Sequence, residues 1–200
     1  AVIGEDRETT IIDGGQNGSV LLMDGVDVQI NELTITNGSG TDVGNWNVGG
    51  GMYALNSNLV ISNCNITDNH ISRSLSDGGG IHLEGEGTVI IKNSLITNNF
   101  TTGAGGGITC ANSSTKIINC VIYGNAVSDN NPGGIWVTED GFVEIINSIV
   151  FNNQANNNSN YNINYDGYGN EFTLEVMYSL IEDGLEEEGN IDANPLFCLS

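Results

Sequence analysis

The sequence predicts an all-β solenoid, a single-stranded parallel β-helix of about six coils with three short strands in each coil. The first observation is a phrase that begins and ends with Asn and encloses aliphatic residues. It occurs as NCNITDN, NSLITNN, NCVIYGN and NSIVFNN, beginning at Asn63, Asn93, Asn119 and Asn147. Successive phrases begin 30, 26 and 28 residues apart. A period of this size with strand-like chemistry indicates stacked repeats.

The second observation is a glycine-rich mark before the first strand of each coil. It reads GGGM ending at Met52, GGGI at Ile81, GGGI at Ile108 and PGGI at Ile135. Each coil also holds three short apolar runs that are bounded by turn residues and lack a helical period. The aligned coils start near residues 20, 51, 80, 107, 134 and 171, so residues 1–200 are expected to form one domain. The sixth coil, FTLEVMYSLIEDG, is degenerate.

Alternation with a period of two residues assigns the inward faces of the strands. The first strands are expected to point Met52, Ile81, Ile108 and Ile135 inward, and then Ala54, Leu83, Cys110 and Val137. The second strands contribute Leu59, Val89, Thr115 and Val143, and then Ile61, Ile91, Ile117 and Ile145. The third strands contribute Ile66, Ile96, Ile122 and Val150. Like residues would therefore stack on like through one continuous core.

The recurring Asn and Gly residues are interpreted as scaffold. A second Asn series closes the phrases at Asn69, Asn99, Asn125 and Asn153. Both series are expected to adopt the left-handed conformation at corners and to form amide ladders between coils. The glycines before each first strand are expected at corners that need positive φ. They do not form a phosphate loop, because no helix and no GK[ST] follow them.

Composition excludes several function classes. Four Lys and Arg residues oppose 25 Asp and Glu residues, which gives a formal net charge of -21. Such a chain repels nucleic acid and anionic membranes, so neither is an expected partner. No apolar run reaches the roughly 18 residues of a membrane-spanning helix. We interpret the chain as a piece of a longer secreted protein, whose other domains are expected partners.

The cysteines do not predict a simple pair of disulfides. Cys64 and Cys120 occupy the same slot two coils apart. With rungs ~4.8 Å apart, their separation would be ~10 Å, which exceeds disulfide reach. Cys110 falls in a different strand and is expected to be buried. The sequence leaves the state of Cys198 open.

The GGGI mark and the N-C-x-I-x-x-N phrase resemble the β-helix repeats of bacterial surface and secreted proteins, including the polymorphic outer-membrane protein type. More broadly, the chain is similar to the pectin-lyase-like right-handed β-helix superfamily over roughly residues 10–197. The ending GNIDANPLF also resembles the close of such domains. The resemblance implies a right-handed coil and a secreted or cell-surface bacterial protein. It does not select an activity, because these folds host lyases, hydrolases, adhesins and spacers.

Candidate ligand-binding residues lie on outward positions, because inward positions are used for packing. Tyr53, His82, Thr109 and Trp136 share one outward slot of the first strand. The variable connections 38–48, 70–77, 100–104 and 126–132 adjoin that strand. Aromatic rings beside carboxylates and an Arg suit a sugar polymer, the expected partner. The predicted ligand-binding residues are Trp46, Tyr53, Arg73, Asp77, His82 and Trp136.

Enzyme alternatives stay open. A polysaccharide lyase acting on uronic acids would use Arg73 with His70 or His82, but the Asp cluster facing an Arg that the resemblance implies is not visible. A glycoside hydrolase would need two facing carboxylates, and Asp77 with Glu84 is the nearest candidate pair. The sequence therefore identifies no catalytic residue beyond these candidates.

Calcium is the one cofactor that the sequence leaves possible. The acidic run at residues 182–189 offers Glu182, Asp183, Glu186 and Glu187 as oxygen ligands. The run lacks the spacing of known calcium loops, so a solvated turn without metal is favoured. The His residues lack the spacing of a zinc site.

One outward column becomes apolar toward the C-terminus, from Ser62 and Lys92 through Ile118, Ile146 and Met177. We expect residues 154–170 to fold back over it, although contact with another domain is the alternative.

The favoured function is non-catalytic binding or adhesion to extracellular carbohydrate or cell-surface glycan. The alternatives are a lyase or hydrolase on such a polymer, or a rigid spacer.

Overall fold

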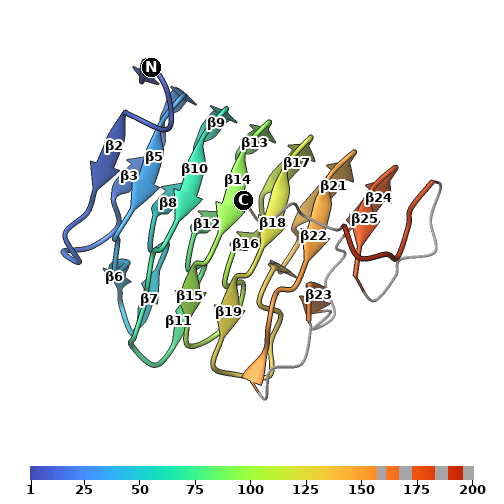
Figure 1. The fold of residues 1–200 in the computed structure, drawn as a ribbon. Helices are drawn as coiled ribbons and strands as arrows, with labels where there is room; N and C mark the ends of the chain where they lie inside the picture. The colour runs from blue at the N-terminus through green and yellow to red at the C-terminus, as the bar shows by residue number, and fades with distance from the viewer. Residues whose placement is uncertain (157–160, 167–172, 183–188, 196–200) are drawn as a thin grey trace.

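The computed structural model describes residues 1–156, 161–166, 173–182 and 189–195, and it shows the predicted solenoid (Figure 1). Each coil contributes one strand to each of three parallel sheets, in the order first, second and third. The coils wind in the right-handed sense that parallel connections favour. The described part of the chain contains no α-helix.

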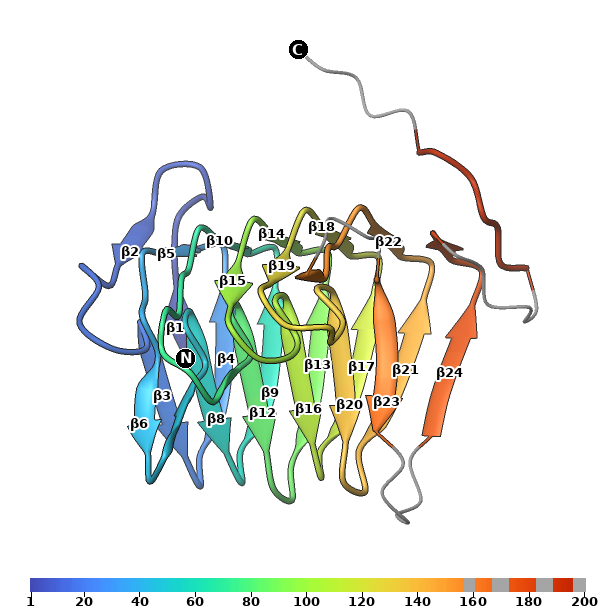
Figure 2. The same cartoon turned by 90° about the horizontal axis from the view of Figure 1, so that it is seen from below.

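The first sheet contains β3 (Leu21–Asp24), β8 (Met52–Leu55), β12 (Ile81–Glu84), β16 (Ile108–Ala111), β20 (Ile135–Thr138) and β23 (Ile163–Asp166). The second contains β1 (Val2–Ile3), β4 (Asp27–Asn31), β9 (Asn58–Ser62), β13 (Thr88–Lys92), β17 (Ser114–Ile118), β21 (Phe142–Ile146) and β24 (Thr173–Met177). The third contains β2 (Ile11–Asp13), β5 (Thr34–Thr36), β10 (Asn65–Thr67), β14 (Leu95–Thr97), β18 (Val121–Tyr123), β22 (Ile149–Phe151) and β25 (Leu180–Ile181). Figure 2 shows the first-sheet strands β8, β12, β16, β20 and β23 side by side.

The sixth coil begins earlier than the sequence indicated. Its first strand is β23, at Ile163–Asp166, which pairs in parallel with β20; the expected start was near residue 171. The prediction that residues 154–170 fold over the outward column of the second sheet is therefore wrong for this strand. The strand was missed because no glycine-rich mark precedes it. At the other end, β1 and β2 add rungs ahead of the first coil on the second and third sheets.

The predicted inward columns form the core. Met52, Ile81, Ile108 and Ile135 lie in register on adjacent strands, and all four are fully buried. The corresponding columns of the second and third sheets are buried as well. The core therefore repeats with each coil, as the like-on-like stacking predicted.

An inner ladder of Asn side chains runs through the corner after the third sheet. Asn69 donates from Nδ2 to Oδ1 of Asn99 at 2.9 Å, and the same bond links Asn99 to Asn125 and Asn125 to Asn153. Asn162 continues the ladder by accepting from Asn153. Each Oδ1 also accepts from a backbone N–H, as Asn99 Oδ1 does from Asn69 N at 3.1 Å. The predicted amide ladder is confirmed in this series, and its members are buried.

The two Asn series differ in backbone conformation. Asn63, Asn93, Asn119 and Asn147 have φ between 48° and 54°, which confirms the left-handed corner. For the second series that expectation is wrong, because the preceding residue takes the left-handed conformation instead. Asp68, Gly124 and their equivalents Asn98 and Asn152 have positive φ. Because Asp68 takes the corner conformation, the side-chain amide of Asn69 lies inside the coil.

The glycine-rich marks serve two purposes, of which the sequence predicted one. Gly78 has a φ of 66°, as a corner requires, and Pro132 stands at the corresponding position of the fifth coil. The third glycine of the mark has ordinary φ and is needed for close packing. A Cβ on Gly80 would lie 2.6 Å from the carbonyl oxygen of Gly107. Adjacent coils therefore approach closely at this corner.

Cys64, Cys110 and Cys120 are buried free thiols, so the expectation that Cys64 and Cys120 are not bridged is confirmed. Burial raises the pKa of Cys110 and of Cys120 to about 11. Thiols in such surroundings are poor nucleophiles. Cys198 lies outside the described residues.

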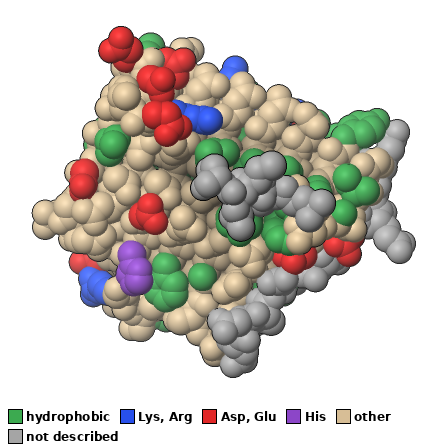
Figure 3. All heavy atoms as spheres, in the orientation of Figure 1, with side chains coloured by type: hydrophobic (Ala, Val, Ile, Leu, Met, Phe, Trp, Pro, Cys, Tyr) green, Lys and Arg blue, Asp and Glu red, His purple; other side chains and the backbone are tan. Residues whose placement is uncertain are grey.

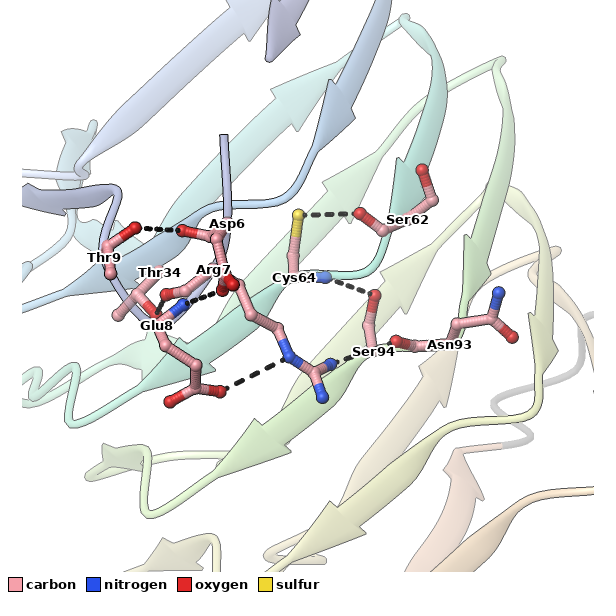
Figure 4. Close-up of polar contacts among 9 residues, drawn as sticks. All are labelled: Asp6, Arg7, Glu8, Thr9, Thr34, Ser62, Cys64, Asn93 and Ser94. Atoms are coloured by element: carbon pink, nitrogen blue, oxygen red, sulfur yellow. Dashed lines mark hydrogen bonds and ion pairs between the residues drawn. The ribbon is translucent and has the colours of Figure 1, made fainter. Parts of the chain in front are cut away.

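The N-terminal segment crosses the corner between the second and third sheets (Figure 4). Thr34 donates to the carbonyl oxygen of Arg7 at 2.7 Å, and the Arg7 guanidinium donates to the carbonyl oxygen of Asn93 at 3.3 Å. Glu8 lies 3.6 Å from Arg7 Nε. The Arg7 side chain thus contacts the corner between the second and third sheets.

Candidate binding cleft

Two outward columns of the first sheet form the floor of the candidate site. The register places Tyr53, His82, Thr109 and Trp136 in one column, as the period of two predicted. The next outward column contains Leu55, Glu84, Ala111 and Thr138. Because the columns stand on rigid neighbouring strands, the spacing of their side chains is set by the solenoid itself.

The connections from the third sheet back to the first form a wall beside this floor. They carry β6 (Thr41–Val43), β7 (Trp46–Val48), β11 (Ser76–Asp77), β15 (Phe100–Thr101) and β19 (Ala126–Val127). The order β11-β7-β6 makes one small sheet, and β15 pairs with β19. Figure 1 shows these strands in a row along one side of the coils. The connections therefore stack like the coils that they join.

A cleft with a cavity volume of about 690 Å³ lies between the floor and the wall. Its floor includes His82, Glu84 and Trp136, and Asp77 joins them from the wall. Val43, Trp46 and Leu75 form an apolar lip with exposed fractions of 38%, 47% and 53%. Asp129 and Glu139 complete the polar lining together with Asn131. Single exposed apolar residues are ordinary on a protein surface, but three at the mouth of one cleft suggest a contact surface.

Glu84 is held as a carboxylate at the floor. Its Oε2 accepts a hydrogen bond from the Tyr53 hydroxyl at 2.8 Å and lies 3.7 Å from His82 Nε2. His82 and, to a smaller extent, the Tyr53 hydroxyl hold the pKa of Glu84 below its ordinary value, against the opposing effect of partial burial. In turn, burial and then the Glu84 carboxylate raise the pKa of Tyr53. Tyr53 stays a hydroxyl donor at any ordinary pH.

His82 leaves one ring nitrogen without a partner. The residue is 6% exposed, and its Nδ1 is buried with no hydrogen bond. Its ring also packs beside that of Tyr53, with centroids 5.6 Å apart. Because buried polar groups are nearly always satisfied, an unpaired imidazole nitrogen at the floor of a cleft is a reason to expect a ligand.

Asp77 has the opposite electrostatic setting from Glu84. Its Oδ1 accepts from the backbone N–H of Ala104 at 2.8 Å, and burial raises the pKa of the carboxyl above its ordinary value. Nearby His82 opposes that rise. Two carboxyl groups of one cleft thus have pKa values that are shifted in opposite directions.

The predicted site residues are only partly brought together. Trp46, Asp77, His82 and Trp136 line the cleft. Tyr53 lies behind Glu84 and is 4% exposed, so it supports the site without lining it.

Arg73 is absent from the described lining and pairs with Asp42 on the exposed surface. Of the residues considered for a lyase, His70 stacks on Phe100 with ring centroids 4.5 Å apart and does not line the cleft either. The expectation that both would reach one groove with His82 is therefore not met.

Several lining residues were not predicted. Ala111 and Thr138 belong to the second outward column, which the same alternation could have identified beside Glu84. Leu75 lines the lip with a φ of 60°, a conformation that a Leu side chain disfavours. Nothing in the sequence signals it. Backbone strain of this kind often accompanies binding sites.

The described residues give no support for a metal centre. Among them, no group of three or more His, Cys, Asp and Glu side chains could hold an ion. Of the calcium candidates, Glu182 accepts from the backbone N–H of Asn152 at 2.7 Å, and Asn162 Nδ2 donates to it at 3.3 Å. It thus closes the end of the inner Asn ladder. Asp183, Glu186 and Glu187 lie outside the described residues.

Stacked coils of three parallel strands with variable connections define a right-handed β-helix that carries a lateral cleft. Residues 7–176 match the family model of the right-handed β-helix region, and the chain belongs to that family. Neither the curated proteins nor the solved structures gave a match to the chain. Within the described part of the chain, no helix has the length and apolarity to cross a membrane.

Proposed function

We propose that this chain is a non-catalytic binding domain of a secreted or cell-surface bacterial protein, and that its cleft binds extracellular carbohydrate. The observation that carries the proposal is the placement of Trp46 and Trp136, the two tryptophans of the chain, in one open cleft. Indole rings pack against the apolar faces of sugars, while carboxylates and imidazole nitrogens bind hydroxyl groups. Asp77, Glu84 and His82 supply those polar groups.

The two tryptophans also make the test direct, because all indole fluorescence originates at the cleft. A glycan array would identify ligands, and titration of tryptophan emission would give their affinities. Trp46→Phe and Trp136→Phe each leave a single reporter, so the contribution of each ring can be followed separately.

We expect Trp136→Ala to weaken glycan binding by about tenfold or more, the scale of a well-buried aromatic contact. Tyr123→Ala is the matched control, because Tyr123 is an outward aromatic residue of the third sheet that stacks on Phe151, away from the cleft. Failure of the wild-type chain to bind any glycan would reject the proposal and leave a rigid spacer as the simpler function. Undiminished binding by Trp136→Ala would reject the cleft as the site.

Hydrolysis of the bound glycan is a second candidate, which one observation favours. The pKa of Asp77 is raised while that of Glu84 is lowered, and a general acid paired with an ionised carboxylate needs such a difference. Incubation of the chain with each ligand found on the array, followed by an assay for new reducing ends, distinguishes hydrolysis from binding alone. Activity that disappears in both Asp77→Asn and Glu84→Gln would support the enzyme.

A further inference from the structure

The charge of the cleft indicates which carbohydrates it could select. Four carboxylates line it, those of Asp77, Glu84, Asp129 and Glu139, and the described lining contains no Lys or Arg. None of the four basic residues of the chain lines the cleft. Arg7 contacts the N-terminal corner, Arg73 pairs with Asp42, and Lys116 pairs with Glu144 on the second sheet. The described lining thus has no Lys or Arg to neutralise an acidic sugar.

The unpaired nitrogen of His82 adds a second constraint. Because Nε2 lies toward the Glu84 carboxylate, the proton of a neutral ring belongs on Nε2, and Nδ1 is then an acceptor. His82 lines the cleft, so this acceptor belongs to a side chain of the site. A ligand that donates hydrogen bonds there would satisfy the nitrogen, whereas a carboxylate or sulfate could not.

The aromatic residues fit the same ligand chemistry. An indole face attracts a cation that lies over it, in addition to packing against a sugar ring. Trp46 and Trp136 therefore favour a sugar that carries a positive charge, and the acidic lining neutralises that charge. Glu84 stays ionised for this purpose because its pKa is held low.

From these features we infer that the cleft selects saccharides with free ammonium groups, that is, deacetylated amino sugars, over neutral, N-acetylated or acidic ones. This inference rests on the proposed carbohydrate binding and narrows its ligand class. The ammonium group lies among Glu84, Asp77 and the rim carboxylates, and one of its N–H groups is directed at His82. The sugar rings lie against the two tryptophans.

The test uses three oligosaccharides of equal length: oligoglucosamine, oligo-N-acetylglucosamine and oligogalacturonate. Binding is titrated by tryptophan fluorescence in weakly acidic buffer, in which the amines are protonated. We expect oligoglucosamine to bind at least about tenfold more tightly than the N-acetylated form, with oligogalacturonate weakest. Added salt should reduce the preference, because exposed charge interactions are screened.

Two variants of equal charge change test the site. Glu84→Gln should remove most of the preference for oligoglucosamine, measured as the ratio of its affinity to that of the N-acetylated oligomer for the same variant. Asp68→Asn removes a carboxylate that does not line the cleft, at a position of positive φ that Asn accepts, and should leave the preference unchanged.

The outcomes separate this inference from the proposed function. Equal or stronger binding of oligo-N-acetylglucosamine or oligogalacturonate would overturn the selection of amino sugars and leave carbohydrate binding intact. A preference that survives Glu84→Gln would also overturn it. So would a preference that falls equally in Glu84→Gln and Asp68→Asn, because the overall negative charge would then be the cause. Binding of none of the three, together with an empty glycan array, would overturn both.

Discussion

Two columns of side chains run along this solenoid with one residue from each coil, and they follow opposite rules. The inner ladder repeats Asn at positions 69, 99, 125 and 153, and each member makes the same hydrogen bonds. The floor of the cleft changes at every rung, from Tyr53 to His82 to Thr109 to Trp136. Both columns take one residue from each of the same coils, so the number of coils and their spacing do not explain the difference.

The difference follows from what surrounds each column. Inside the ladder, Asn99, Asn125 and Asn153 each have an Asn on both sides, and each donates to the Oδ1 of the next one. A residue of the cleft floor faces a connection whose length differs between coils, as with 38–48 and 100–104. Repetition therefore stabilises the architecture, and the ligand-facing chemistry lies where repetition stops. Figure 3 shows one exposed face of the molecule, on which the charged side chains are irregularly scattered.

The largest expected effect of a substitution is in the ladder. In Asn99→Ala, the backbone N–H and side-chain amide of Asn69 lose their acceptor, and the carbonyl oxygen of Ile66 loses a donor at 2.9 Å. Leaving buried groups unsatisfied costs roughly 1–3 kcal/mol each. We expect a loss of about 3 kcal/mol in the free energy of unfolding, measured by urea denaturation.

Asn98→Gly is the neighbouring control for this substitution. Asn98 is exposed and has a φ of 54°, which Gly also adopts readily. The change in stability should stay within about 0.5 kcal/mol. If Asn99→Ala were no more harmful than Asn98→Gly, the ladder would contribute no more than the surface corner, and the contrast between the two columns would fail.

The sequence was sufficient to predict the repeated part of the molecule, because each coil repeats the residues of its neighbours. Ile81, Ile108 and Ile135 recur in one slot, and their register follows from the Asn phrases alone. The side of each coil that carries the floor was also predictable from alternation. The contacts that each connection makes with its neighbours were not predictable from the sequence. Arg73 was expected at the groove but pairs with Asp42. The course of residues 70–77 depends on the pairing of β11 with β7, and the sequence does not show that pairing.

A similar limit explains the errors at the corners. The sequence places an Asn at the end of each phrase, but whether that residue or the one before it takes positive φ depends on the inner ladder. In the third coil Asn98 takes it and Asn99 points inward. Both residues are Asn, so their local preferences are the same and only burial distinguishes them.

The second prediction concerns the two shifted carboxyl groups of the cleft. Because burial raises the folded-state pKa of Asp77 above its unfolded value, the favourable contribution of this group is fully present at pH below the unfolded pKa. It is lost as the pH rises through the folded pKa. Asp77→Asn retains an acceptor for the N–H of Ala104 and removes the buried charge. It should raise stability at neutral pH, by less than the loss in Asn99→Ala, and give no gain in strong acid.

Glu84→Gln should show the opposite dependence on pH. The folded-state pKa of Glu84 is lowered, so its contribution is present above the unfolded pKa and is lost as the pH falls through the folded pKa. The variant should therefore be less stable than the wild type at neutral pH and similar to it in acid. Urea denaturation of both variants over the acidic range measures this; parallel pH profiles for the two variants would contradict the opposite settings of the two groups.

The smallest expected effect lies at the lip of the cleft, where binding and stability should separate. Leu75 has a φ of 60° and is 53% exposed. A left-handed Leu costs about 1 kcal/mol, and Asn relieves much of that cost. Leu75→Asn should therefore raise the free energy of unfolding by up to about 1 kcal/mol while it weakens ligand binding. Leu75→Ala loses the same apolar surface but retains the strained backbone, so it should weaken binding without any gain in stability. Equal stability of the two variants would contradict this prediction and show that the backbone at Leu75 carries no strain.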